Sequence, residues 1–189
     1  MQHTHSMNIT LPVLQEKLKA WDGCALCKTA NPVLGEGNAN AKIMFIGEAP
    51  GQREDEQGRP FVGPAGKFLN ELLESIELRR EDVYISNVVK YRPPENRDPT
   101  DEEKEQCMPW LKMEIAILKP KVIVPLGRHA LGHFFPKLGM TQAHGKPQKL
   151  KDIAIFPIYH PAAALHNGSF RQALYDDFAA LKAFLDAAA

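Results

Sequence analysis

Three cysteines are the first residues of the chain whose spacing suggests chemistry. Cys24 and Cys27 form a Cys-x-x-Cys pair, and Cys107 stands alone much further along. A set of three cannot be fully paired within one chain, which argues against a disulfide framework. The pattern is typical instead of a metal or cluster site that is one ligand short. His129 and His133, spaced i and i+4, imitate a metal-binding pair, but no third ligand is near in sequence, so we interpret them as structural.

Four further residues stand where a side chain could meet a ligand. Glu48 and His160 each follow an apolar run, where an acid can position a water molecule and a histidine can donate to a developing negative charge. Asn87 lies inside an apolar run, where its amide is either structural or presents a donor and an acceptor to a base-like edge. Phe61 lies in a glycine-flanked loop, as a core plug or as a face for stacking a flat ligand. None of the four is specific by itself, since solvated acids and structural histidines are common.

The periodicity of apolar residues predicts the elements that must position these side chains. Short apolar runs predict buried strands at residues 42–46, 83–89, 121–124 and 153–157. Helical spacing predicts helices at residues 11–22, 65–76, 100–118, 128–135 and 170–185. This alternation predicts an α/β fold, a three-layer αβα sandwich with a four-stranded, mainly parallel sheet. Ligands bind such sheets beyond the carboxyl ends of the strands, which indicates the loops after Ile46, Val89, Val124 and Pro157.

Length and composition bound the class of protein. A chain of 189 residues suits one domain, which we assign to residues 11–189 after a disordered N-terminus at residues 1–10. The 23 Lys and Arg residues equal the 23 Asp and Glu residues, and this zero net charge excludes binding to nucleic acid through bulk positive charge. No apolar run approaches the ~20 residues of a membrane span. The start of the chain has no hydrophobic signal core, so we expect a cytoplasmic protein without a membrane partner.

Taken in order, the motifs are far more specific than any one of them. They are Gly47-Glu-Ala-Pro-Gly51, Gly58-Arg-Pro-Phe-Val-Gly-Pro-Ala-Gly66, Ser86-Asn-Val-Val-Lys90, Arg92-Pro-Pro-Glu-Asn-Arg97 and His160-Pro-Ala-Ala-Ala164. This series resembles the family 4 uracil-DNA glycosylases, from about Cys24 to the end of the chain. The resemblance implies the uracil-DNA glycosylase fold. It also implies a monofunctional DNA-repair hydrolase that flips uracil out of DNA, cleaves its N-glycosidic bond and leaves an abasic site for base excision repair.

The resemblance assigns the recognition of the base to three residues. Phe61 would stack on the flipped uracil. Asn87 would bond the edge of the base at the ring N–H and at O4. His160 would bond O2 as the leaving uracil gains negative charge, which is where such a reaction needs a donor.

The resemblance also assigns the acids of the first motif and its loop. Glu48 would help to position the attacking water, and Glu54 would assist at the pocket. Ala49 would lie at the uracil, in the position where a related family has a water-activating Asp, so catalysis should depend more on His160. Gly51 stands where that family has a bulky Tyr, which leaves the rejection of the thymine methyl group without an assigned residue.

Family 4 enzymes carry a [4Fe–4S] cluster on four cysteines, and the resemblance matches three of them to Cys24, Cys27 and Cys107. Tyr91 stands where the remaining cysteine is expected, in a register that its neighbours fix. Three outcomes stay open. Tyr91 is the fourth ligand, or the cluster is a three-iron form or has a solvent-held corner, or it is lost or labile and the cysteines are small core residues. We favour a bound cluster with an altered corner.

Contacts with DNA must be local, because the net charge is zero. The candidates are Lys90, Arg92 and Arg97 near the cluster and Lys146 before the last strand. Leu165 is the candidate wedge that fills the space left by the flipped base. We expect a monomer that acts on uracil in single- or double-stranded DNA. The alternative is a catalytically weak DNA-binding or damage-sensing member of the same fold, which the missing cysteine keeps open.

Overall fold

The structure is a computed structural model that describes residues 9–188; of the predicted disordered segment 1–10, residues 1–8 lie outside it. The longer helices are α1 (Leu11–Lys19), α3 (Pro64–Glu74), α4 (Asp101–Leu118), α5 (Gly127–Phe134) and α8 (Ser169–Ala187). The shorter ones are η1 (Ala25–Lys28), α2 (Gln52–Gln57), η2 (Arg80–Asp82), η3 (Pro94–Asn96), α6 (Met140–Ala143) and α7 (Ala162–His166). The strands are β1 (Glu36–Gly37), β2 (Ile43–Gly47), β3 (Tyr84–Asn87), β4 (Val122–Pro125), β5 (Gln148–Leu150) and β6 (Ile153–Ile155).

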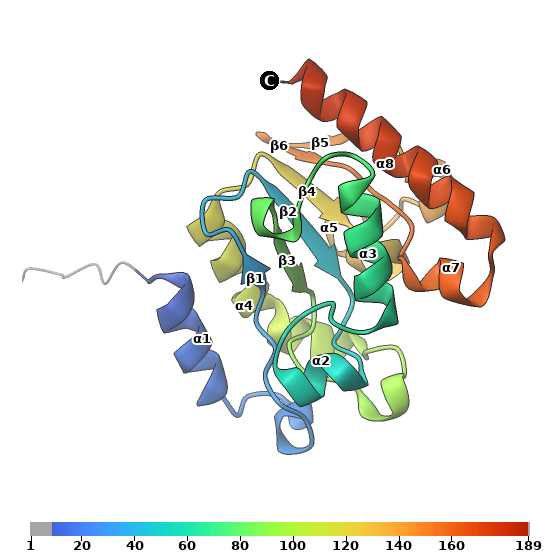
Figure 1. Ribbon diagram of the computed structural model, residues 1–189. Helices are drawn as coiled ribbons and strands as arrows, with labels where there is room; N and C mark the ends of the chain where they lie inside the picture. Colours follow the sequence, from blue (N-terminus) through green and yellow to red (C-terminus); the bar gives the residue numbers. More distant parts are fainter. Residues whose placement is uncertain (1–8, 189) are drawn as a thin grey trace, which may run out of the picture.

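The strands form one mixed sheet in the order β1-β3-β2-β4-β6-β5 (Figure 1). Its four central strands are parallel and are the four that the sequence predicts, whereas β1 and β5 pair antiparallel at the two edges. The prediction of a four-stranded sheet is therefore wrong, and the sheet has six strands. The sequence gives no signal for the edges because β1 and β5 have only two and three residues, too few to show a period.

The pleat of the strands divides the interior into two apolar cores, one on each face of the sheet. Along β2, Met44 and Ile46 enter the first core, and Phe45 between them enters the second. The first core is closed by α1, α4 and α5, with Leu111 of α4 fully buried. The second is closed by α3 and α8, where the ring of Phe178 stacks on Phe45 with the centroids 5.9 Å apart. Helices therefore cover both faces, and the carboxyl edge of the sheet stays available for a site.

The five predicted helices are all present, with ends shifted by a few residues. Thr100 caps α4, since its hydroxyl accepts from the Glu103 N–H and the Glu103 carboxylate accepts from the Thr100 N–H. The loop after β2 contains the additional short helix α2, which ends at Gly58 with a φ of 65°. Within residues 9–188, no helix combines the length and the apolar character that a membrane crossing needs.

Candidate functional site

A pocket of about 500 Å³ opens at the carboxyl ends of β2 and β3. Its lining includes all six predicted catalytic and uracil-binding residues, which are Glu48, Ala49, Glu54, Phe61, Asn87 and His160. The register of β2 and β3 places Gly47 directly beside Asn87, and the chain after β6 brings His160 to the same edge. The fold thus joins, at the edge where parallel sheets bind ligands, residues from segments far apart in the sequence.

Gly47 allows Phe61 and Asn87 to approach each other in the pocket wall. A Cβ at Gly47 would overlap Asn87 Oδ1 and lie 2.6 Å from Phe61 Cζ, so only glycine fits here. Asn87 is 2% exposed, and its Oδ1 is buried without a hydrogen-bond partner among the described residues. An unsatisfied buried oxygen costs on the order of 1–3 kcal/mol. This oxygen is therefore suited to accept a hydrogen bond from a ligand in the pocket.

Two charged side chains hold Phe61 in an uncommon backbone conformation. Its φ of 51° lies in the left-handed region, which a bulky side chain rarely adopts. Glu54 Oε1 accepts hydrogen bonds from the backbone N–H groups of Val62 at 2.8 Å and Gly63 at 2.7 Å. From the other side, Arg80 donates to the carbonyl oxygen of Phe61 at 2.9 Å. Glu54 therefore fixes the loop that presents the aromatic ring, besides lining the pocket itself.

His160 presents a neutral N–H group to the pocket. The Ala162 backbone N–H donates to His160 Nδ1 at 3.1 Å, which leaves the ring proton on Nε2. Burial lowers the pKa of His160 to about 4, against the opposing charge of Glu54. The ring lies next to Phe61, with the two centroids 5.6 Å apart. At neutral pH, His160 is thus an uncharged donor beside the aromatic face.

Glu48 has a carboxyl group whose proton is held unusually firmly. Its Oε1 is buried and lacks a hydrogen-bond partner among the described residues. Burial and then the negative charge of Asp98 raise the pKa of Glu48 to about 7, while the positive charges of Lys104 and Arg128 lower it. Near neutral pH this carboxyl can both accept and release a proton, as general acid–base catalysis requires.

The structure adds Asp98 and His129 to this corner of the pocket. Asp98 lines the pocket, and His129 Nε2 lies 3.1 Å from Asp98 Oδ2 and 3.7 Å from Glu48 Oε1. His133, one turn further along α5, does not belong to this group. His129 was expected to be structural and Asp98 was not a candidate, because Asp98 and His129 stand in a turn and a helix that only the tertiary fold brings to Glu48.

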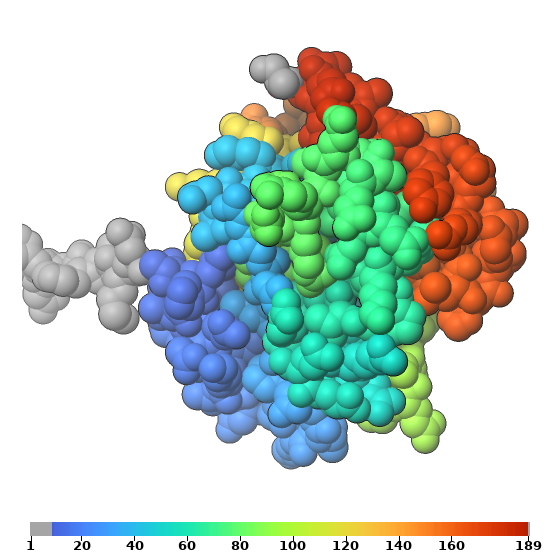
Figure 2. Space-filling view, in the orientation of Figure 1, coloured from blue at the N-terminus to red at the C-terminus, as the bar shows by residue number. Residues whose placement is uncertain are grey.

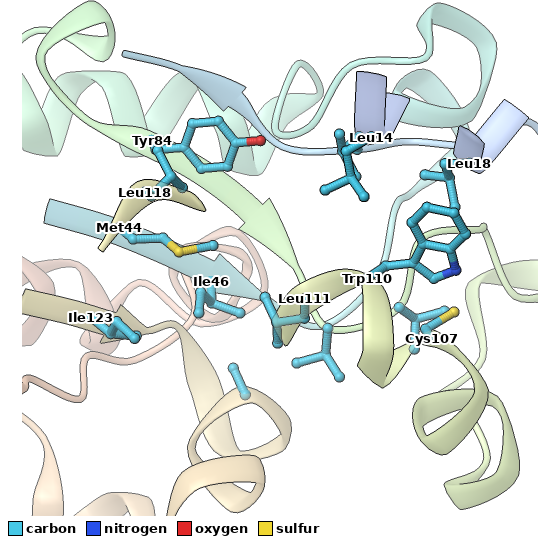
Figure 3. Packing of buried hydrophobic residues seen from close by; sticks show 14 of the residues in the cluster. Leu14, Leu18, Met44, Ile46, Tyr84, Cys107, Trp110, Leu111, Leu118 and Ile123 are labelled. Atoms are coloured by element: carbon cyan, nitrogen blue, oxygen red, sulfur yellow. The ribbon is translucent and has the colours of Figure 1, made fainter. Parts of the chain in front are cut away.

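The three cysteines share the first core, with Cys24 and Cys107 buried in it and Cys27 packed against it. Cys24 and Cys107 are 2% and 0% exposed, and burial raises the pKa of both thiols. Burial raises the pKa of Cys107 to about 12, although the Lys90 N–H, 3.4 Å from the sulfur, opposes this. Figure 3 shows Cys107 projecting from α4 at the first core. The cysteines therefore lie against the apolar side chains of this core.

Tyr91 occupies the predicted fourth position, but its hydroxyl is bound elsewhere. The hydroxyl donates to the carbonyl oxygens of Leu18 at 3.1 Å and Trp21 at 3.3 Å. Its ring packs on that of Trp21, with the centroids 5.9 Å apart. Burial, followed by the charges of the cysteines, raises the pKa of Tyr91, whereas iron binds the deprotonated phenol. Three thiols are therefore the donor set that this geometry offers, and the Tyr91 phenol does not fit as a fourth ligand.

Lys90 is not an exposed DNA contact, and that prediction is wrong. Lys90 and Glu114 are both fully buried, with Lys90 Nζ 2.5 Å from Glu114 Oε2. Lys90 Nζ also donates to Ser86 Oγ at 2.8 Å and to the Asn87 carbonyl at 2.6 Å. A buried ammonium is tolerated only with such partners. Lys90 therefore supports the end of β3 from inside the protein.

The other predicted DNA contacts are accessible to different degrees. Arg97 lines the pocket, but its guanidinium forms two hydrogen bonds with Glu103, at 2.6 and 2.8 Å. Arg92 is half-buried, and Lys146 is exposed. Leu165 on α7 is 48% exposed, which is unusual for a large apolar side chain. Figure 2 shows α7 and α8, in orange to red, forming one side of the molecule, away from α1 in blue.

Known proteins resemble the chain over most of its length. The profile of the Uracil DNA glycosylase superfamily matches residues 34–182. The chain is 48% identical to a type-4 uracil-DNA glycosylase of Sulfurisphaera tokodaii over 169 residues, which cover 82% of this chain and 77% of that protein. It is 43% identical to a type-4 uracil-DNA glycosylase of Thermotoga maritima over 181 residues, covering 93% of this chain and 94% of the relative. A type-5 uracil-DNA glycosylase of Thermus thermophilus is 37% identical over 129 residues, 60% of this chain and 58% of its own.

Proposed function

The chain belongs to the uracil-DNA glycosylase superfamily, and we propose that its pocket receives a uracil flipped out of DNA and releases the base by hydrolysis. The chain is a uracil-DNA glycosylase and acts in DNA repair, as its type-4 relatives do. One observation carries the proposed mechanism: the unpaired Asn87 amide oxygen and the neutral His160 N–H line the same pocket as the Phe61 ring. Together they complement the edge and the face of a pyrimidine.

Recognition of the base uses the donors and acceptors that the pocket leaves free. Asn87 Oδ1 accepts from the uracil N3–H, and its amide N–H donates to O4. Phe61 stacks on the ring, and the Glu54 carboxylate keeps this loop in place. A base inside a duplex cannot reach these groups, so the nucleotide is flipped out at a cost of about a few kcal/mol.

Cleavage breaks the bond between C1′ and N1, and its electron pair leaves with the uracil. The negative charge spreads onto the base oxygens, and the His160 Nε2–H donates to O2 as this charge develops. Because His160 is uncharged before the reaction, its hydrogen bond strengthens as the anion forms. Ala49 lines the pocket and has no carboxylate, so catalysis depends mainly on stabilising the leaving uracil.

Attack by water completes the reaction on the sugar. The water oxygen bonds to C1′, and Glu48 in its ionised form takes the proton, leaving an abasic sugar and the uracil anion, which solvent protonates. With a pKa of about 7, Glu48 is ionised in an increasing fraction of molecules as the pH rises through neutrality. The rate of release should follow this ionisation.

DNA reaches the pocket over a small set of surface residues. We propose that Arg92, Arg97 and Lys146 contact phosphates and that exposed Leu165 fills the space left by the flipped base. We also propose that the enzyme acts as a monomer. Phosphate contacts of this kind do not read sequence, which suits an enzyme that must find uracil in single- or double-stranded DNA.

We also propose that Cys24, Cys27 and Cys107 hold an iron–sulfur cluster with an altered fourth corner, either a three-iron form or one held by solvent. The three cysteines share the first core, and the Tyr91 hydroxyl is bound to two carbonyl groups. A bound cluster would cross-link η1 to α4 and stabilise the segment that follows β3. The residues of the uracil pocket do not include these ligands, so the cluster has no part in the steps above.

Release of uracil from defined oligonucleotides tests the function. Purified protein is incubated with a single strand and with a duplex that contain one uracil, the duplex with a U·G mispair, and free base and abasic sites are quantified. We expect both products from both substrates and none from matched thymine oligonucleotides. Folded protein that binds the uracil strands without releasing base would instead support the damage-sensing alternative.

A further inference from the structure

We propose that His129 is a positioning residue for the hydrolysis and that, with Asp98, it determines how readily Glu48 gives up its proton. The inference rests on the proposed action of Glu48 on the attacking water. It concerns residues outside the motifs that define the pocket. His129 comes from α5 and Asp98 from the turn before α4, and both reach the buried side of Glu48.

Glu48 is a neighbour of His129 with a carboxylate oxygen that lacks a hydrogen-bond partner among the described residues. Glu48 Oε1 has no hydrogen-bond partner in residues 9–188, and His129 Nε2 is 3.7 Å away. The start of α5 is anchored, because the Gly127 N–H donates to the Ile158 carbonyl at 2.9 Å and a Cβ on Gly127 would lie 3.0 Å from His160 Cβ. The anchored helix therefore holds His129 Nε2 beside Glu48 Oε1.

The charges around Glu48 divide into two opposed sets. Asp98 raises the pKa of Glu48, and Lys104 and Arg128 lower it. Burial lowers the pKa of His129, with Asp98 opposing, so this ring is uncharged near neutral pH. His160, which lines the pocket together with His166, has a pKa lowered by burial and is uncharged as well. His129 therefore acts on Glu48 as a hydrogen-bond donor and not as a cation.

Arg128 and Asp98 control which nitrogen of His129 holds the proton. Arg128 donates to Asp98 Oδ2 and to His129 Nε2, both at 3.0 Å, and the second contact requires an unprotonated Nε2. The Arg128 side chain is 74% exposed, so water readily replaces that contact. Once Nε2 carries the proton, it donates to the carboxylates of Asp98 and Glu48. This tautomer favours the ionised form of Glu48, which accepts the proton of the water.

The pH profile of single-turnover uracil release tests the inference with four variants. Asp98→Asn removes a negative charge, so the rise in rate should move about one pH unit lower. His129→Phe removes the donor, so the rise should move higher and the rate at the acid end should fall about tenfold for a shift of one pH unit. His129→Gln keeps an N–H group and should restore the profile. His133→Phe, one turn along the same helix, is the matched control and should leave the profile unchanged.

Opposite shifts in Asp98→Asn and His129→Phe would support the inference, because a purely structural role moves neither midpoint. A wild-type midpoint in folded His129→Phe protein would overturn it and leave the proposed function standing, as uracil would still be released. Assays with and without EDTA are compared, since Glu48, Asp98 and His129 are close enough to hold a cation. A profile that depends on EDTA would also overturn it. Full activity in Glu48→Gln protein would refute the proposed role of Glu48 itself.

Discussion

The uracil pocket and the thiol site lie at opposite ends of one short segment and differ in how the protein satisfies their polar groups. Asn87 begins the segment with a buried amide oxygen that has no hydrogen-bond partner among residues 9–188, and Tyr91 ends it with a hydroxyl bound to two carbonyl groups. An unsatisfied buried atom marks a position that a ligand completes, because leaving it unpaired is costly. A buried polar atom that is already hydrogen-bonded marks a position where the protein itself supplies the partner. The pocket thus leaves a buried acceptor for a ligand, whereas the hydroxyl at the expected fourth position of the thiol site is already satisfied.

Lys90 lies between the two sites, and its removal has the largest expected effect. Its N–H contacts the Cys107 sulfur, and its ammonium holds the Asn87 carbonyl and Glu114. Lys90→Met leaves a buried carboxylate without its cation, which should lower the free energy of unfolding by about 3–5 kcal/mol. Denaturant unfolding followed by circular dichroism measures this change.

The double variant Lys90→Met/Glu114→Leu is the matched control for that prediction. Removing both charges of a buried pair is often nearly neutral, so stability should return toward that of the wild type. Uracil release should nonetheless stay reduced, since the Asn87 carbonyl has lost its donor. If the double variant is as unstable as the single one, the network holds the fold by shape and not by charge.

His160→Ala tests whether the pocket, and not the thiol site, carries out the release of uracil. Removing one donor to a developing anion should lower the single-turnover rate about 10²–10³-fold. Binding of uracil-containing DNA and the iron content should stay near those of the wild type, because His160 does not contact the thiols. A rate that survives in both His160→Ala and Asn87→Ala would show that the chemistry takes place elsewhere.

Glu54→Gln tests how far the rigid Phe61 loop contributes to the pocket. The amide oxygen of Gln still accepts from Val62 and Gly63 but without the charge, which weakens these hydrogen bonds by about 1 kcal/mol. The Michaelis constant for uracil-containing DNA should rise several-fold, more than the maximal rate falls. Glu56→Gln, on the same helix and bonded only to exposed Gln52, is the control and should change neither.

The contrast also explains what the sequence could and could not predict. Glu48 and His160 could be expected at one edge because each follows an apolar run and parallel strands bring their carboxyl ends together, whereas Asn87 was expected inside a strand and is the last residue of β3. Lys90 was assigned to the surface because lysines usually are exposed. Only the packing of α4 reveals that Glu114 neutralises it.

The missed residues share a different cause. Asp98 follows η3, a turn in which Glu95 and Asn96 have positive φ angles of 55° and 54°. No periodic sequence pattern predicts such a turn, so the contact of Asp98 with His129 on α5 cannot be predicted from the sequence. Local patterns thus predict elements and their ends, whereas contacts between irregular segments depend on the whole fold.

Tyr91→Phe has the smallest expected effect. It tests whether the Tyr91 hydroxyl binds the cluster or the side chain only fills space in the core. Phe keeps the packing on Trp21 and loses only the hydrogen bonds to the carbonyls of Leu18 and Trp21, which should cost about 1 kcal/mol of stability. If the hydroxyl is not a ligand, iron, sulfide and visible absorption stay at wild-type values. Tyr91→Cys should raise the iron and sulfide content and slow the loss of the cluster to chelator, because a fourth thiolate completes the set. Loss of iron in Tyr91→Phe protein would show instead that the phenol binds the cluster, and both regions would then count as sites completed by a ligand.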